Sequence, residues 1–310
     1  MNVGFVGLGN LGRQLAASLL RTGFPLCVCD LDAAAVAGLV AAGASPASSP
    51  RAAAEASDCV ITCLPSPRAV SEVVAGADGV IEGLRPGGTW IDMSTNDPHE
   101  LARLAALAGD SGIATLECPV TGGVHKAAAG EITVIAGGDG AVFAAHRAVL
   151  EAMGSPVIHV GPLGQASVIK LVTNMLAFIH VVAVGEALML AKQGGVPLET
   201  AYEVICASSG NSFVHETESQ VILNGSYDIG FSMDLALKDL GFALALGREY
   251  AVPLELAGLV QQTFARAREQ YGGTAQSTQV VKLLEDSLGI DLRAPNFPAR
   301  LDGTSQAREP

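Results

Sequence analysis

The sequence predicts an α/β protein with a doubly wound parallel sheet first, an all-helical region second, and a long helix that joins them. Short apolar runs alternate with helical patterns up to residue 163. An almost wholly apolar stretch without proline then covers 164–193, and only helical patterns follow it. We therefore expect four regions: a sheet domain at 1–163, an interdomain helix at 164–193, a helical domain at 194–290 and an irregular tail at 291–310.

The composition bounds the class of protein. With 310 residues, 49% of them hydrophobic, the chain can build two domains with separate cores. A net charge of −13 argues against binding to nucleic acid or to anionic membranes, which attract clustered Lys and Arg. The six cysteines include no CxxC pair and no His/Cys zinc spacing, which indicates free thiols and no metal centre. Because no signal-peptide pattern opens the sequence, we expect a cytoplasmic protein.

The first expected strand, at 2–6, leads directly into a glycine loop. A helix and a second strand at 26–28 follow the loop, which reads Gly7-Leu8-Gly9-Asn10-Leu11-Gly12. A GxGxxG spacing between a strand and a helix is the Rossmann-type pattern for a dinucleotide cofactor. Gly7 permits the turn, Gly9 leaves room for the pyrophosphate, and Gly12 lets the helix approach the strand. The N–H groups at the start of the helix then face the phosphates.

Asp30 lies at the end of the second strand, 18 residues after Gly12. A carboxylate at about this spacing binds the ribose hydroxyls of NAD and repels the 2′-phosphate of NADP. We therefore expect NAD as the cofactor, with NADP less favoured. The alternative is that Asp30, close to Asp32, only caps a helix or belongs to a turn.

The alternation of strands and helices continues to the end of the first region. Further strands are expected at 59–64, 90–93, 114–117, 132–136 and 156–160. Ser66-Pro67 and Asp97-Pro98 are typical helix starts. Because ligands of open α/β sheets bind at the carboxyl ends of strands, we expect the cofactor site to be lined by Leu64, Pro65, Ser94 and Thr95. The alternative is that these are ordinary loop residues.

Thr121-Gly122-Gly123 follows the strand at 114–117 and is a candidate anion site. Two adjacent glycines after a threonine let consecutive backbone N–H groups point the same way. Such a nest binds an oxyanion, here a carboxylate. The alternative is an ordinary turn.

The long helix carries Lys170 and Asn174 on one face, because they lie four residues apart. A membrane span is disfavoured because Lys170, His180 and Glu186 interrupt the apolar stretch. The alternative for Lys170 is a snorkelling lysine on an ordinary buried helix. Later helices are expected at 198–207, 233–250, 254–271 and 274–288. Phe231 and Lys238-Asp239 stand out there, although Lys238 could lie on the exposed face of an amphipathic helix.

Four motifs in this order resemble the β-hydroxyacid dehydrogenases, the group of 3-hydroxyisobutyrate dehydrogenase and tartronate semialdehyde reductase. They are GFVGLGNLG at the start, CPVTGGVHKAAAGEI in the middle, GQASVIKLVTNML in the long helix and FSMDLALKDLGFAL late in the chain. The resemblance extends to about Leu288. It implies an NAD-binding Rossmann domain, a helical domain for substrate binding and oligomerisation, and a homodimer or homotetramer.

The resemblance also implies roles for individual residues. Lys170 would be the general acid and base, with Asn174 as its partner at the substrate. The substrate carboxylate would be bound by Thr121, Gly122 and Gly123, and Phe231 would form part of the pocket wall. The cofactor would contact Asn10, Leu11 and Lys238. The implied reaction is a reversible hydride transfer between nicotinamide and a small 3-hydroxy acid or its semialdehyde.

The chain departs from the family pattern at three positions. Leu11 replaces a methionine, Thr121 replaces a serine, and Thr173 replaces the first of two asparagines after the lysine, which leaves the substrate open. Alternatives on the same scaffold are an imine reductase and a non-catalytic NAD-binding partner protein. Lys170 argues against both, because the imine reductases typically replace this lysine and the partner proteins lack it.

Overall fold

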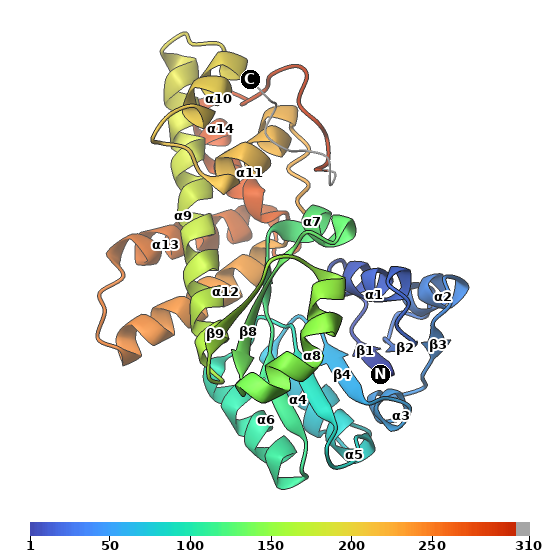
Figure 1. Cartoon of the computed structure of the whole chain (residues 1–310). Helices are drawn as coiled ribbons and strands as arrows, with labels where there is room; N and C mark the ends of the chain where they lie inside the picture. The colour runs from blue at the N-terminus through green and yellow to red at the C-terminus, as the bar shows by residue number, and fades with distance from the viewer. Residues whose placement is uncertain (302–310) are drawn as a thin grey trace. The chain divides into compact units, whose positions relative to one another are not determined.

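The computed structural model describes residues 1–301 and divides into two compact units. The sheet unit covers Met1–Lys170 and the helical unit covers Leu171–Pro310. Helix α9 (Gln165–Gln193) contains the boundary between them (Figure 1). The predicted fold class, a Rossmann-type sheet followed by helices with a long joining helix, is confirmed. The part of the predicted tail at 302–310 lies outside the described residues.

Within the described residues, the sheet unit has nine strands in the order β3-β2-β1-β4-β5-β6-β8-β7, with β9 paired to β8. They are β1 (Val3–Val6), β2 (Leu26–Cys29), β3 (Ser45–Pro46), β4 (Cys59–Thr62), β5 (Thr89–Asp92), β6 (Ala114–Glu117), β7 (Val120–Thr121), β8 (Thr133–Gly138) and β9 (Val157–Gly161). Every strand that the sequence predicts is present, with ends that differ by at most two residues. The prediction lacks β3 and β7, which have two residues each.

One part of the sheet departs from the parallel pattern. β8 runs antiparallel to β6 and β7, whereas β9 is parallel to β8. Residues 122–132 connect β7 to β8. This connection is too short for a parallel crossover, which needs about a dozen residues or more.

Helices cover both faces of the sheet, as a doubly wound fold requires. They are α1 (Gly12–Arg21), α2 (Ala33–Ala41), α3 (Pro50–Glu55), α4 (Pro67–Ala75), α5 (Val80–Gly83), α6 (Pro98–Asp110), α7 (Gly123–Ala129) and α8 (Gly140–Met153). One core contains Phe5 and Ile91 with residues of α1 and α8. The other contains Val6 and Trp90 with residues of α3, α4 and α6. Neighbouring strand residues are thus buried on opposite faces, which explains the continuous apolar runs.

The helical unit contains one helix that the sequence did not predict. Its elements after α9 are α10 (Leu198–Cys206), α11 (Phe213–Asn224), α12 (Met233–Glu249), α13 (Glu255–Tyr271), the 3-10 helix η1 (Ser277–Val281) and α14 (Lys282–Leu288). The single helix predicted at 274–288 is η1 followed by α14. α11 is missing from the prediction because polar residues such as His215 and Ser219 are buried in it, which weakens its apolar periodicity. Its ends nevertheless carry ordinary signals, a capping Ser212 and a left-handed Gly225.

Helix α9 is long and apolar enough to cross a membrane by length and composition alone, with a mean hydropathy of 1.9 over 18 residues. Its residues Phe178, Val181 and Leu188 belong to the core of the helical unit, together with Leu240 of α12 and Phe264 of α13. A position in this core accounts for the apolar composition of the helix.

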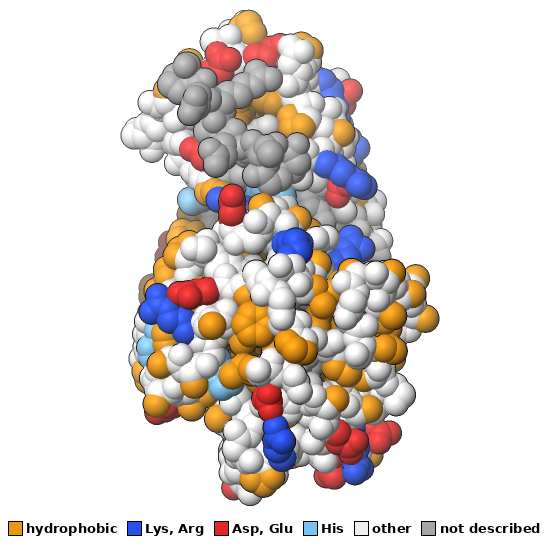
Figure 2. All heavy atoms as spheres, turned by 45° about the vertical axis from the view of Figure 1, so that its right-hand side comes forward, with side chains coloured by type: hydrophobic (Ala, Val, Ile, Leu, Met, Phe, Trp, Pro, Cys, Tyr) orange, Lys and Arg blue, Asp and Glu red, His pale blue; other side chains and the backbone are white. Residues whose placement is uncertain are grey.

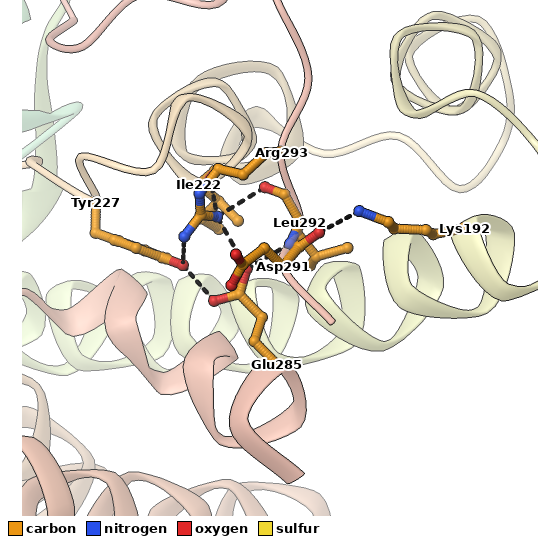
Figure 3. A network of polar contacts seen from close by, with 7 residues as sticks. All are labelled: Lys192, Ile222, Tyr227, Glu285, Asp291, Leu292 and Arg293. Carbon is orange, nitrogen blue, oxygen red and sulfur yellow. Dashed lines mark hydrogen bonds and ion pairs between the residues drawn. The ribbon is translucent and has the colours of Figure 1, made fainter. Parts of the chain in front are cut away.

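The chain after α14 has no helix or strand through Leu301, but hydrogen bonds hold its first residues on the helical unit. Glu285 of α14 is 2% exposed and accepts from the guanidinium of Arg293 at 2.9 Å. Tyr227 donates to the same carboxylate and accepts from Arg293 (Figure 3). Lys192, in the last turn of α9, donates to the carbonyl of Asp291.

Candidate active site

The glycine loop between β1 and α1 is shaped by close approach of the backbone. Gly7 has a φ of +99°, and a Cβ there would lie 2.4 Å from the carbonyl oxygen of Cys63. A Cβ on Gly12 would lie 2.0 Å from the carbonyl oxygen of Gly7, so only glycine lets α1 start this near to β1. A Cβ on Gly9 would meet no atom within 4 Å. The space at Gly9 is therefore open, as a bound pyrophosphate would require.

Helix α1 differs from its neighbours at its N-terminus. Each of α2, α3, α4, α6 and α8 follows a Ser or Asp whose side chain accepts a backbone N–H of the first turn. The N-cap of α1 is Leu11, which makes no such hydrogen bond, and the exposed Gly9 and Asn10 precede it. A helix start that no side chain caps suits an anion. The loop thus fits the phosphates of a dinucleotide.

Asp30 follows β2 and lies against the glycine loop. One carboxylate oxygen accepts the N–H of Leu8 at 2.5 Å, and the other accepts the N–H of Asp32 at 2.7 Å. Asp32 is the residue that caps α2, so Asp30 is not a helix cap, but its bond to the N–H two residues later is a turn contact of the kind that the alternative named. The half-buried Asp30 is next to the loop, where a ribose is expected.

The loops after β4 and β5 lie side by side at the carboxyl ends of their strands. The N–H of Leu64 donates to the hydroxyl of Ser94 at 2.9 Å. This bond joins the segment that contains Pro65 to the segment that contains Thr95. The two segments are expected to be neighbours because both follow the carboxyl ends of parallel strands.

Asp92, at the end of β5, forms hydrogen bonds next to both loops, and it was not identified from the sequence. It is 1% exposed and accepts from the hydroxyl of Thr62 at 2.9 Å and from the amide of Asn96 at 3.1 Å. Burial raises the pKa of Asp92. An acid inside an apolar strand was the signal that could have identified it, because buried carboxyls need partners.

Thr121, Gly122 and Gly123 lie where β7 ends and α7 begins. Gly122 has a φ of +125° and Gly123 a φ of +88°, a region that other residues rarely adopt. A Cβ on Gly123 would lie 3.0 Å from the ring of His125. The backbone conformation of this turn therefore depends on both glycines.

Lys170 lies in the second turn of α9, at the end of the sheet unit. It is 8% exposed. Burial of an ammonium costs free energy that interactions inside the protein must offset. Two residues of the preceding turn, Ala166 and Ser167, bond to the buried carboxylate of Glu117. Glu117 is a second residue that sequence reasoning missed.

In the helical unit, Asn174 of α9 donates its amide to the carboxylate of Asp239 at 2.6 Å. Asp239, on α12, is 1% exposed and pairs with Lys238 at 2.8 Å, whose side chain is 18% exposed. The alternative that Lys238 lies on an exposed helix face is therefore wrong. Phe231 precedes α12 and stacks on Phe178 of α9, with ring centroids 6.0 Å apart. Asp239 stands out in the sequence together with Lys238, but only the structure gives its partners.

The predicted residues thus form one set in each unit. The sheet unit holds Gly7, Gly9, Asn10, Leu11, Gly12, Asp30, Leu64, Pro65, Thr95, Thr121, Gly122, Gly123 and Lys170, and the helical unit holds Asn174, Phe231 and Lys238. Among residues 1–301, no group of three or more His, Cys, Asp or Glu could hold a metal ion. Figure 2 shows Lys and Arg side chains and Asp and Glu side chains on the face that it presents.

Two family models together match most of the chain. The NAD binding domain of 6-phosphogluconate dehydrogenase matches residues 2–161, and the NAD-binding domain of NADP-dependent 3-hydroxyisobutyrate dehydrogenase matches residues 164–284. The chain is 35% identical to 2-(hydroxymethyl)glutarate dehydrogenase of Eubacterium barkeri, over 94% of this chain and 97% of that protein.

Solved structures agree with these matches. 3-Hydroxyisobutyrate dehydrogenase from Salmonella typhimurium is 33% identical, with a TM-score of 0.84 over 91% of this chain and 99% of that chain. Psf3 in complex with NADP+ and 2-OPP is 26% identical, with a TM-score of 0.84 over the same shares of the two chains.

Proposed function

Because the chain belongs to the β-hydroxyacid dehydrogenase family of NAD(P)-dependent oxidoreductases, we propose that it oxidises a small 3-hydroxy acid or reduces the corresponding semialdehyde. When bound, the nicotinamide cofactor would accept or supply the hydride. The observation that carries the proposal is the pair Lys170 and Asn174, two buried polar residues one turn apart on a largely apolar helix.

Lys170 transfers the proton of the substrate hydroxyl, as base in oxidation and as acid in reduction. Burial favours the neutral amine over the ammonium, so a lysine inside the protein can act as a base nearer to neutral pH. In its ammonium form Lys170 also stabilises the negative charge that develops on the alkoxide oxygen. Asn174, held by Asp239, orients the substrate hydroxyl or the lysine.

The turn at Thr121, Gly122 and Gly123 binds the substrate carboxylate through its backbone N–H groups, and Phe231 forms part of the pocket wall. A panel of hydroxy acids would identify the substrate. The panel contains 3-hydroxyisobutyrate, glycerate, serine, 3-hydroxypropionate, 4-hydroxybutyrate, a sulfonated analogue and 2-(hydroxymethyl)glutarate, for which the Eubacterium barkeri relative is named. The NAD reduction rate with each member would identify the acid with the highest kcat/KM.

We assign NAD rather than NADP as the preferred cofactor. The support is Asp30, whose carboxylate bonds to the glycine loop where the ribose is expected and would repel a 2′-phosphate. The start of α1, beside Gly7, Gly9 and Gly12, would hold the phosphates. Leu64, Pro65, Thr95 and Lys238 would supply further contacts to the cofactor.

The test of the proposed function is Lys170→Ala. Removal of a general acid–base group lowers kcat by about 10²–10⁴-fold, and loss of alkoxide stabilisation adds to this. Lys170→Arg should also be inactive, because a guanidinium does not lose its proton near neutral pH. NAD binding, measured by calorimetry, should persist in both variants because the glycine loop is unchanged. A Lys170→Ala enzyme with more than about a tenth of wild-type kcat would rule out the acid–base role.

We propose that the protein is a homodimer or homotetramer of the cytoplasm, with domain boundaries near residues 163, 193 and 290. The support for association is a set of exposed apolar residues on α9: Ile169, Val172 and Leu176, spaced three and four apart, and Leu190 further along. Light scattering of the purified protein would give the oligomeric state. Replacing Val172 and Leu176 by Gln should yield monomers, whereas an unchanged mass would exclude this face.

A further inference from the structure

Glu117 is a buried carboxylate outside the set of residues assigned above. It ends β6 and is 1% exposed. Its oxygens accept from the N–H groups of Ala166 (2.9 Å) and Ser167 (3.0 Å), and also from the N–H of Gly164 and the hydroxyl of Ser167. The first N–H groups of a helix have no partner inside the helix. A carboxylate from a distant strand therefore caps the start of α9.

Gly137 of β8 makes room for this contact. It is the residue opposite Glu117 in the pairing of β6 with β8. A Cβ on Gly137 would lie 2.5 Å from Oε1 of Glu117 and 3.1 Å from the Cβ of Ala166. The strands and the start of α9 thus approach too closely for any side chain at this position.

Five helices of the sheet unit, α2, α3, α4, α6 and α8, are capped by a neighbour in sequence. Asp139 caps α8 through the N–H groups of Ala141 (2.9 Å) and Val142 (3.0 Å). Glu117 instead lies 47 to 50 residues before the groups that it bonds. A local cap fixes only the end of a helix, whereas a cap from a strand also fixes where the helix starts relative to that strand.

Both proposed functional groups of the sheet unit are close to this cap. Lys170 follows Ala166 by four residues and Ser167 by three, so its side chain lies on the same face of α9 as the side chains of these two residues, one turn further on. Thr121 follows Glu117 by four residues along the chain. Glu117 therefore links the helix that carries Lys170 to the end of β6, from which the chain continues through β7 into the Thr121–Gly123 turn.

We propose that Glu117 is a positioning residue that fixes the distance between Lys170 and the Thr121–Gly123 turn. The proposal rests on the roles assigned to those residues under the proposed function. Position matters because a displacement of about 1 Å can lower the rate of an enzymatic step by about a hundredfold. Glu117 acts through Lys170, because its own oxygens face the backbone of α9.

Glu117→Gln tests this role with little change of shape. One oxygen becomes an NH₂ group, which faces the N–H donors of α9 and cannot accept from them. We expect kcat to fall by about 10- to 100-fold, while KM for the hydroxy acid rises less than kcat falls. The dissociation constant of NAD should stay unchanged. Hydrogen exchange at the amides of 164–167 should accelerate.

Two further variants make the test specific. Asp139→Ala is the matched control, because it removes the cap of α8 in the same unit; it should lower Tm and leave kcat unchanged. Ser167→Ala removes the hydroxyl hydrogen bond and keeps the rest of the cap. It should lower kcat less than Glu117→Gln does, and it supplies the test if Glu117→Gln fails to fold.

Wild-type kcat in Glu117→Gln, or in Ser167→Ala if only that variant folds, would overturn the positioning role. A parallel loss of kcat and NAD affinity would do the same, because it would indicate general disruption of the sheet unit. Lys170→Ala, assayed alongside, separates the two proposals. If Lys170→Ala is active, the proposed function fails; if it is inactive while Glu117→Gln is fully active, only the positioning role fails.

Discussion

The sheet unit and the helical unit each bind part of α9 through a buried carboxylate, but the two carboxylates accept hydrogen bonds from different kinds of group. In the sheet unit, Glu117 bonds mainly backbone N–H groups of the first turn. In the helical unit, Asp239 bonds the side chains of Asn174 and Lys238. Every residue except proline has a backbone N–H group. The residue types in the first turn of α9 therefore do not reveal that a carboxylate binds there. Side-chain partners require particular residues, and these can be recognised.

The same contrast extends over the candidate site. The glycine loop and the Thr121–Gly123 turn of the sheet unit offer backbone groups, and their requirement is that no side chain intrudes. The helical unit contributes side chains, Asn174, Phe231 and Lys238. We therefore expect these two glycine segments of the sheet unit to be sensitive to added atoms, and the helical unit to be sensitive to the removal of polar groups.

Gly123→Val has the largest expected effect among the variants that test this contrast. The added side chain would meet His125 and force a φ of +88° on a branched residue. We expect KM for the hydroxy acid to rise by about a hundredfold or more, as for the loss of charge-assisted hydrogen bonds, with little change in NAD affinity. Gly130→Ala is the control, because Gly130 also has a positive φ, at the other end of α7. An equal loss of acid and NAD binding would indicate misfolding instead of a carboxylate site.

Arg293→Ala tests a carboxylate of the helical unit that has no role in the proposed reaction. Glu285 would keep its buried charge and lose its guanidinium partner. Breaking a buried pair costs about 3–5 kcal/mol, and we expect about 2 kcal/mol because the Arg293 side chain is 35% exposed. Urea unfolding measures this, and kcat should be unchanged. Arg300→Ala, which breaks an exposed pair with Asp228, should have almost no effect. A loss of kcat in Arg293→Ala would mean that this network also supports the site.

A double-mutant cycle on Asn174 and Asp239 sharpens the comparison inside the helical unit. If Asp239 acts by holding Asn174, then Asp239→Asn should have little further effect once Asn174 is Ala. We expect a coupling of about 1–2 kcal/mol in kcat/KM. Asp234→Asn on the same helix is the control, because its pair with Arg268 is exposed. Additive effects would show that the two residues act independently.

Asp30→Ala has the smallest expected effect. It removes the charge that disfavours a 2′-phosphate, so the ratio of kcat/KM with NAD to that with NADP should fall by about tenfold, or ~1.4 kcal/mol. Asp32→Ala is the control, since Asp32 caps α2 and should affect stability alone. Wild-type enzyme that prefers NADP would refute the assignment of NAD.

Local rules in the sequence were enough for most of the sheet unit. Ser66 before Pro67 and Asp97 before Pro98 start α4 and α6 through side-chain caps, as their spacing predicts. Gly12 occupies a position where a Cβ would collide with the carbonyl of Gly7. Each of these features depends on residues within a few positions of one another. Fold class, strand positions and the glycine loop could be predicted for that reason.

Long-range contacts decided the rest. Glu117 meets α9 across 47 to 50 residues, Asn174 meets Asp239 across 65, and Asp92 bonds Thr62 across 30. No periodicity or spacing rule connects such pairs, because the free energy of a buried carboxylate depends on which donors the folded chain brings to it. The sequence by itself determined where the strands, the cofactor loop and Lys170 lie along the chain. Only the tertiary structure decided which buried carboxylates hold α9 in place.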